Sequence, residues 1–279
     1  ECHSATIAET TKGDLVATYF GGTKERNPDV CIWVSRKVKG SKEWTKPQMV
    51  ADGIINDTLR KACWNPVVYQ IPQGDLVIYF KIGSSVSDWS GWMVRSKDGG
   101  KTWSKREPLQ KDYLGPVKNK PVMSRGRLIA PSSIESNGWR LYFEYSDDMG
   151  KTWQRTDYVE ADSITIEGKK KLKDLAIQPT IISLKDGRLA ALARTRSEHI
   201  GITYSEDNGK TWSKLKLIDT PNNNSGLDAV TLSDGNHVLI CNDKPIPHGI
   251  KKGKGLRTPL SLMTSGDGES WQHWMTLED

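Results

Sequence analysis

The chain alternates short runs of β-branched and apolar residues with glycine-containing turns along its whole length. In one such unit, Pro66-Val67-Val68 leads through Gly74 to Leu76-Val77-Ile78-Tyr79. Apolar runs joined by glycine turns predict β-hairpins. Equivalent hairpins open at Ala5, Pro66, Pro121, Pro179 and Ala229. No apolar run approaches the roughly 18 residues of a membrane span, so we expect no membrane segment.

A turn motif of eight residues follows each hairpin. Ser96–Trp103 reads SKDGGKTW, Ser146–Trp153 reads SDDMGKTW and Ser205–Trp212 reads SEDNGKTW. A shorter copy ends at Trp271, and a divergent copy ends at Trp44. In such a turn the aspartate accepts hydrogen bonds from nearby backbone amides, the glycine supplies a positive φ, and the tryptophan packs beneath as an anchor. We therefore expect a hairpin between two outer strands, with structural rather than catalytic aspartates.

Two hairpins in each repeat of about 50 to 60 residues give a four-stranded sheet. Sheets repeated radially form a β-propeller, so the predicted fold class is all-β, a propeller of four-stranded blades. We expect one domain over residues 1–279. Its five repeats fall at roughly 1–52, 53–113, 114–163, 164–220 and 221–279.

The octapeptides resemble the Asp-box (BNR) repeats of the sialidase superfamily, and the resemblance covers essentially the whole chain. Five further segments look similar to that family's: Cys2-His3-Ser4-Ala5-Thr6, Phe20-Gly21-Gly22-Thr23, Cys63-Trp64-Asn65-Pro66, Lys118-Asn119-Lys120-Pro121 and Asn224-Ser225-Gly226-Leu227-Asp228. The resemblance implies a six-bladed propeller, of which five repeats are visible. We therefore expect a truncated last blade, or a sixth blade completed by residues outside this chain.

The resemblance also implies a binding site. Sialidases hold a carboxylate with three arginines, use a Tyr–Glu nucleophile pair and protonate with an aspartate. The second arginine matches Arg194 or Arg196, and the third resembles Arg257. At the first arginine this chain has His3, and at the glutamate of the pair it has Gln178. The resemblance thus keeps two carboxylate-binding positions and loses the nucleophile pair.

Antiparallel pairing locates the same site independently, because the start of a sheet's first strand and the end of its second lie at one edge. The residues before the five hairpin openings are Ser4, Asn65, Lys120, Gln178 and Asp228. Seven residues after each turn glycine stand Phe20, Lys81, Ser133, Arg194 and Asn242. Strand ends are commonly polar, so polarity alone does not indicate a binding site. The positive charge expected at this edge does favour an anionic ligand, and it comes from Lys81, Lys120, Arg194, Arg196 and Arg257.

The predicted site combines these lines. The candidate catalytic residues are His3, Asp29, which falls near a sialidase's acid, and Lys120. The candidate substrate-binding residues are Asn65, Lys81, Asn119, Gln178, Arg194, Arg196, Asp228, Asn242 and Arg257. Trp64 and Trp89 are candidates for sugar stacking, with core packing as the alternative for Trp64.

Charge and cysteine content narrow the partners. A net charge of +6 and a pI near 9.0 favour a polyanion, and we expect an acidic oligo- or polysaccharide. We expect no nucleic acid, because the chain has no continuous basic stripe and no nucleic-acid reading motif. The four cysteines form no CxxC pair, and no His/Cys cluster has zinc spacing, so we expect no metal and no cofactor. We expect a secreted or periplasmic location.

The leading functional hypothesis is a carbohydrate-active enzyme acting on a sialic- or uronic-acid-containing glycan. In a hydrolase route, Asp29 or Glu25 would be the acid. In a lyase route, arginines would neutralise a uronate carboxylate while His3 or Lys120 acts as the base. The alternative is a non-catalytic glycan-binding propeller that retains the arginines.

Overall fold

The computed structural model describes residues 1–279 except 137, 162–164, 167–168, 171–174 and 247–256. The described residues form strands, turns and loops, without a helix. Within that part of the chain, therefore, no helix is long and apolar enough to span a membrane. By its internal contacts the chain forms two compact units, Glu1–Pro121 with Asp148–Trp153, and Val122–Asp147 with Gln154–Asp279.

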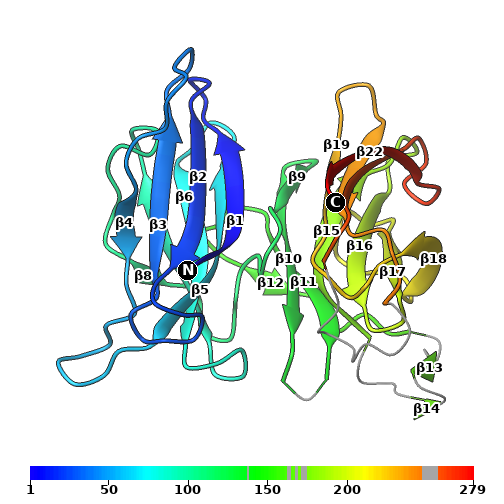
Figure 1. Ribbon diagram of the computed structural model, residues 1–279, viewed down its shortest axis with the longest axis horizontal. Coiled ribbons are helices and arrows are strands. Elements are labelled where there is room, and N and C mark those ends of the chain that lie inside the picture. The colour runs from blue at the N-terminus through cyan, green and yellow to red at the C-terminus, as the bar shows by residue number, and fades with distance from the viewer. Residues whose placement is uncertain (137, 162–164, 167–168, 171–174, 247–256) are drawn as a thin grey trace. The chain divides into compact units, whose positions relative to one another are not determined.

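The first unit contains two four-stranded antiparallel sheets, each with its strands in chain order. Sheet one consists of β1 (Cys2–Glu9), β2 (Leu15–Gly21), β3 (Cys31–Lys37) and β4 (Gln48–Ala51), drawn in blue in Figure 1. Sheet two consists of β5 (Ala62–Gln70), β6 (Leu76–Gly83), β7 (Ser90–Ser96) and β8 (Glu107–Pro108).

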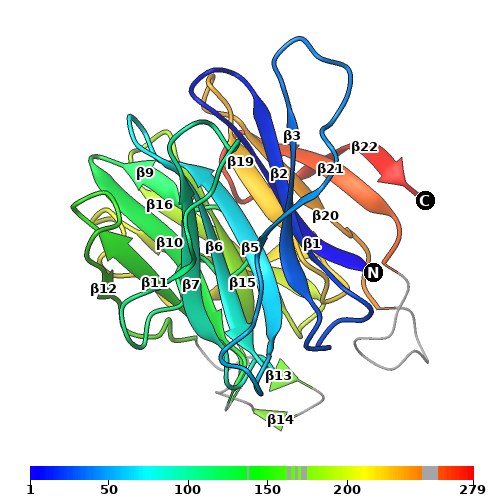
Figure 2. The same ribbon diagram turned by 90° about the vertical axis from the view of Figure 1, so that its left-hand side faces the viewer.

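The second unit contains three further four-stranded antiparallel sheets. Sheet three consists of β9 (Val122–Ser124), β10 (Arg127–Ile134), β11 (Arg140–Ser146) and β12 (Gln154–Arg155). Sheet four consists of β15 (Ala176–Ser183), β16 (Leu189–Thr195), β17 (His199–Ser205) and β18 (Lys216–Pro221). Sheet five consists of β19 (Asp228–Thr231), β20 (His237–Cys241), β21 (Leu260–Ser265) and β22 (Gln272–Glu278), and Figure 2 shows β19, β20 and β21 side by side. A two-stranded ribbon, β13 (Thr165–Ile166) with β14 (Lys169–Lys170), precedes sheet four.

Each of the five sheets falls within one predicted repeat, to within one residue at Pro221. The predicted fold class, an all-β propeller of four-stranded blades, is confirmed. The single domain and the incomplete sixth blade stay predictions.

The octapeptides join the third and fourth strands of their sheets and are built as turns, as the sequence predicts. Asp207 Oδ1 accepts hydrogen bonds from the amides of Lys210 (3.0 Å) and Thr211 (2.9 Å), and its Oδ2 accepts one from the Thr211 hydroxyl (2.6 Å). Asp98 and Asp148 form the same three bonds in their own turns. These aspartates are therefore structural.

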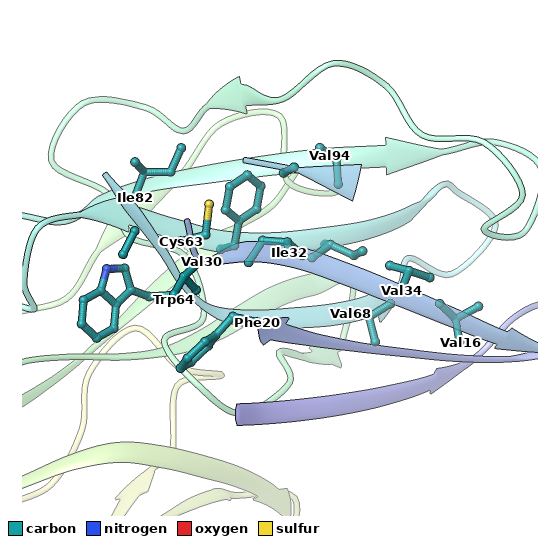
Figure 3. Packing of buried hydrophobic residues seen from close by; sticks show 14 of the residues in the cluster. Val16, Phe20, Val30, Ile32, Val34, Cys63, Trp64, Val68, Ile82 and Val94 are labelled. Carbon is teal, nitrogen blue, oxygen red and sulfur yellow. The ribbon is translucent and has the colours of Figure 1, made fainter. Parts of the chain in front are cut away.

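Each core cluster lies between neighbouring sheets of one unit. Figure 3 shows the first, in which Phe20 and Ile32 of sheet one pack with Trp64, Val68 and Ile82 of sheet two. In the second unit, one cluster joins sheets three and four and another joins sheets four and five. The octapeptide of one sheet contributes to the seam with the preceding sheet. A Cβ on Gly100 would lie 3.1 Å from Val16, and one on Gly268 would lie 2.9 Å from Ile182.

Candidate functional site

The first strands of sheets one, two and four share a β-bulge near their beginning. Pairing with the second strand breaks between His3 and Thr6, between Trp64 and Val67, and between Ile177 and Thr180. Within these bulges Ser4, Asn65 and Gln178 have φ values of 54°, 38° and 55°. Bulges redirect side chains and are frequent beside active sites, where left-handed backbone in residues other than glycine also concentrates. Three residues of the predicted rim thus share one backbone feature.

The predicted common edge is confirmed by the strand register in these three sheets. His3 is paired with Phe20, Trp64 with Lys81, and Ile177 with Arg194. In sheet three, β9 starts at Val122, so Asn119 and Lys120 lie just before the strand. In sheet five, Asn242 lies just past the end of β20. Strand ends therefore carry the predicted residues in every sheet.

Arg194 is the centre of the site in the second unit. Its Nη1 donates to Gln178 Oε1 (3.1 Å), while its Nε and Nη2 donate to Asn224 Oδ1 (3.3 and 3.2 Å). Both acceptors are neutral amide oxygens. The Arg194 guanidinium lies 5.2 Å from the Trp139 ring centroid, and that of Arg196 lies 4.3 Å from the same centroid. One indole thus supports two arginines by cation–π contact.

The surroundings of Arg194 disfavour its positive charge. Burial, followed by the positive charge of Arg257, lowers the pKa of Arg194 to about 10; Arg196 adds to the effect, and the Glu135 carboxylate opposes it. Among the residues that the structure describes, none forms an ion pair with Arg194. A lowered arginine pKa records a charged group without adequate compensation. An anion bound here would supply the missing charge.

Arg257, the third arginine, is exposed and follows the undescribed residues 247–256. The Asn242 side-chain amide donates to the backbone carbonyls of Arg257 (2.6 Å) and Pro259 (2.8 Å). Asn242 is itself buried, so the structure gives it the role of holding the Arg257 segment rather than an open binding surface. Asp228 likewise has a structural partner, because its Oδ1 accepts the Thr180 hydroxyl at 2.8 Å and links β19 to β15.

In the first unit, His3 is exposed at the start of a row of aromatic rings. His3 meets Phe20 edge-on at 5.4 Å between centroids, Phe20 lies 6.3 Å from Trp64, and Trp64 lies 6.1 Å from Trp89. Trp64 is buried and donates its indole N–H to the Gly83 carbonyl (2.8 Å), so it is a core residue. Trp89 is partly exposed and is the one of the two that can offer a face to a sugar.

Four further predicted site residues of the first unit, the binding candidates Asn65, Lys81 and Asn119 and the catalytic candidate Lys120, differ in accessibility. Lys81 is fully buried, and its amino group donates to the Pro116 carbonyl, which is a packing role that its position at the strand end did not reveal. Asn119 is buried and accepts a hydrogen bond from Lys118 Nζ (2.9 Å). Asn65 and Lys120 are partly exposed. Of these four, Asn65 and Lys120 are the residues within reach of a ligand.

Asp29 has an environment opposite to that of a general acid. Its exposed carboxylate accepts hydrogen bonds from the Thr23 hydroxyl and from the Thr23 backbone amide (2.8 Å). These bonds, the hydroxyl first, lower the pKa of Asp29. A general acid working near neutral pH needs a raised pKa. In this conformation Asp29 anchors a turn.

From the sequence alone, no site role was assigned to Trp139, Asn224 or Glu135. Trp139 lies in the turn between β10 and β11, outside any repeat motif, and Asn224 belongs to a polar run, Asn222-Asn223-Asn224, that offered a signal. Glu135 follows β10 directly. In the described part of the chain, no three His, Cys, Asp or Glu residues are grouped to hold a metal. The single cavity predicted for His3, Lys120, Arg194 and Asn242 stays a prediction.

Comparison with known proteins places the chain among sialidase-like sequences. A family model described as a BNR repeat-like domain matches residues 13–279. The anhydrosialidase of Macrobdella decora is 31% identical over 179 residues, covering 58% of this chain and 22% of that protein. The sialidase of Paraclostridium sordellii is 28% identical over 179 residues, covering 54% of this chain and 41% of that protein. The chain thus spans less than half the length of these two relatives.

Solved structures agree on the fold. The intramolecular trans-sialidase of Ruminococcus gnavus matches with a TM-score of 0.72 at 14% identity, covering 100% of this chain and 85% of that one. The NanB sialidase of Streptococcus pneumoniae (K499G mutant) matches with a TM-score of 0.71 at 14% identity, covering 98% and 61%. At these identities the likeness shows the fold alone.

Proposed function

The chain belongs to the BNR repeat-like domain family, and from this membership we propose that it is a sialidase-like carbohydrate-active enzyme for an acidic glycan. We place the sugar carboxylate at Arg194, Arg196 and Arg257. The relatives named above, an anhydrosialidase and a sialidase, support the reaction class. The observation that carries the proposal is Arg194, a partly buried cation that is hydrogen-bonded to neutral oxygens and whose pKa is lowered by the charges of two other arginines.

A sugar carboxylate suits this cluster for physical reasons. Guanidinium groups pair with carboxylates through two parallel hydrogen bonds, which fixes the orientation of the ligand as well as its charge. Trp139 holds Arg194 and Arg196 against one ring, so their positions are set before a ligand arrives. Preorganised charge costs less to use than charge that must be assembled on binding.

The proposed reaction is hydrolysis or intramolecular transfer of the acidic sugar, as the names of the relatives suggest, and those names give a lyase route no support. We assign proton transfer to His3 or Lys120, because the bonds from Thr23 keep Asp29 ionised. His3 is exposed at the bulged start of β1, and Lys120 lies partly exposed before β9. Gln178 cannot act as a carboxylate base.

Arg194→Ala is the test of the proposed site. We expect affinity for 3′-sialyllactose, measured by isothermal titration calorimetry, to fall at least tenfold, while the weak affinity for lactose stays unchanged. Hydrogen bonds to charged groups contribute about 1.5–3 kcal/mol each, so losing one is sufficient for this effect. Arg188→Ala is the matched control, because Arg188 directly precedes β16, the strand that carries Arg194, but is ion-paired with Asp186 at the turn end. Equal losses for both ligands, or an equal loss in Arg188→Ala, would contradict the proposed site.

A non-catalytic glycan-binding propeller is the second candidate. It is favoured by Gln178, because this neutral amide stands where the resemblance calls for the glutamate of the Tyr–Glu nucleophile pair. The two candidates separate on turnover. Release of free or anhydro sugar from a sialylated oligosaccharide that disappears in His3→Ala supports the enzyme, whereas binding without any product supports the second candidate.

A further inference from the structure

We propose that Gln178 and Asn224 determine the anion specificity of the arginine cluster: they orient Arg194 with neutral oxygens and so leave its charge to the ligand. The inference rests on the proposed function, because it concerns the same site. Both residues are positioning residues, since they act through Arg194.

The geometry gives the two amides control of the whole guanidinium. Gln178 Oε1 accepts a hydrogen bond from Arg194 Nη1, and Asn224 Oδ1 accepts hydrogen bonds from both Nε and Nη2, at 3.1 to 3.3 Å. The two acceptors come from different segments, the bulge of β15 and the loop before β19, so together they fix the plane of the group. These neutral contacts on two sides therefore set the direction of the remaining N–H groups of Arg194, which are the ones available to a ligand.

The backbone holds both amides in place. Gln178 has a φ of 55° inside the β15 bulge, and its backbone N–H donates to the Ser133 hydroxyl (3.1 Å) of the neighbouring sheet. Asn224 has a φ of 65° and is buried. Left-handed backbone in non-glycine residues is sparsely populated, and it persists where the surroundings fix it. The backbone thus fixes the positions from which both side chains reach Arg194.

The neutrality of these acceptors has a direct electrostatic consequence. A carboxylate at either position would stand within hydrogen-bond distance of Arg194 and would form an ion pair in a partly buried setting. Such a partner favours the charged arginine and would reverse the lowering of its pKa. It would also compete with a ligand carboxylate for the same guanidinium. An amide oxygen gives the orientation without this competition.

The test uses isosteric replacements of amide by carboxylate, Gln178→Glu and Asn224→Asp. We expect each to weaken binding of N-acetylneuraminic acid at least tenfold by isothermal titration calorimetry. We also expect each to raise the thermal unfolding midpoint of the ligand-free protein at pH 7 and low salt, because Arg194 gains a counter-charge. A destabilised fold could weaken binding but could not raise the midpoint.

Gln272→Glu is the matched control. It makes the same chemical change on the exposed first residue of β22, at the edge of sheet five opposite Asn242, and it should alter neither affinity nor midpoint. Affinities within twofold of wild type in both Gln178→Glu and Asn224→Asp would overturn the inference. If the wild-type protein binds no acidic sugar, the proposed function fails. The thermal unfolding midpoints of the ligand-free variants then test the orienting role on their own. A rise in both variants but not in Gln272→Glu then upholds the orienting role, and unchanged midpoints overturn it.

Discussion

Trp212→Ala should lower the free energy of unfolding by about 3 kcal/mol, the lower end of the range for removing a large aromatic side chain from a core. The indole stacks on Phe143 of the preceding sheet, with centroids 3.7 Å apart and planes at 15°, and its N–H donates to the Gly209 carbonyl (3.2 Å). Phe143 is fully buried, so truncation leaves a cavity in the seam between sheets three and four. Urea denaturation followed by circular dichroism measures the loss.

Trp44→Ala is the control for this prediction, because Trp44 closes the divergent octapeptide copy and is 42% exposed. Removing it should cost less than about 1 kcal/mol, as is usual for surface substitutions away from special features. Similar losses in the two variants would show that the tryptophan's place in the motif, and not its packing on the neighbouring sheet, determines its contribution.

The fold could be predicted because its information is local. Asp98, Asp148 and Asp207 sit in turns closed by bonds three and four residues ahead, so a motif of eight residues contains the whole device. Strand register follows from the same locality. Once two strands are joined by a short turn, the pairing of Val67 with Tyr79 is fixed by counting from Gly74. The five sheets and their common edge were therefore readable from the sequence.

The site could be predicted only in part, because accessibility and partners depend on residues distant in sequence. Counting along β6 placed Lys81 at the edge, but its burial against the Pro116 carbonyl comes from a loop 35 residues later. Trp139 supports two arginines from a turn that has no repeat signature. The bulge at Gln178 adds a residue that hydrophobic patterning does not register, because the pattern on either side of it is intact.

In the fifth sheet a histidine occupies the position that a leucine occupies in sheets two, three and four. Leu76, Leu128 and Leu189 are paired with the serine that opens the octapeptide of their sheets, and at the same register position His237 is paired with Ser265. The His237 ring is buried (1% exposed), and its Nε2 has no hydrogen-bond partner among the described residues. A buried unsatisfied polar atom costs about 1–3 kcal/mol. The leucines of the other sheets avoid this cost.

His237→Leu should therefore raise the free energy of unfolding by about 1–2 kcal/mol at pH 7. Thr231 loses the contact of its hydroxyl with His237 Nδ1 (3.1 Å) but keeps its bonds to the Ser183 amide (3.0 Å) and carbonyl (3.4 Å).

The stability gained in His237→Leu should grow as the pH falls. Burial, helped by Lys185, lowers the pKa of His237 in the folded protein below its ordinary 6.5, so below pH 6.5 the unfolded chain binds more protons. Wild type thus loses stability as the pH falls from about 6.5 toward the folded pKa, and the leucine variant lacks that loss. Leu189→His, the reciprocal change in sheet four, should destabilise in the same pH-dependent way. Parallel pH–stability curves for wild type and His237→Leu, measured by urea denaturation from pH 7 to pH 5, would refute this account.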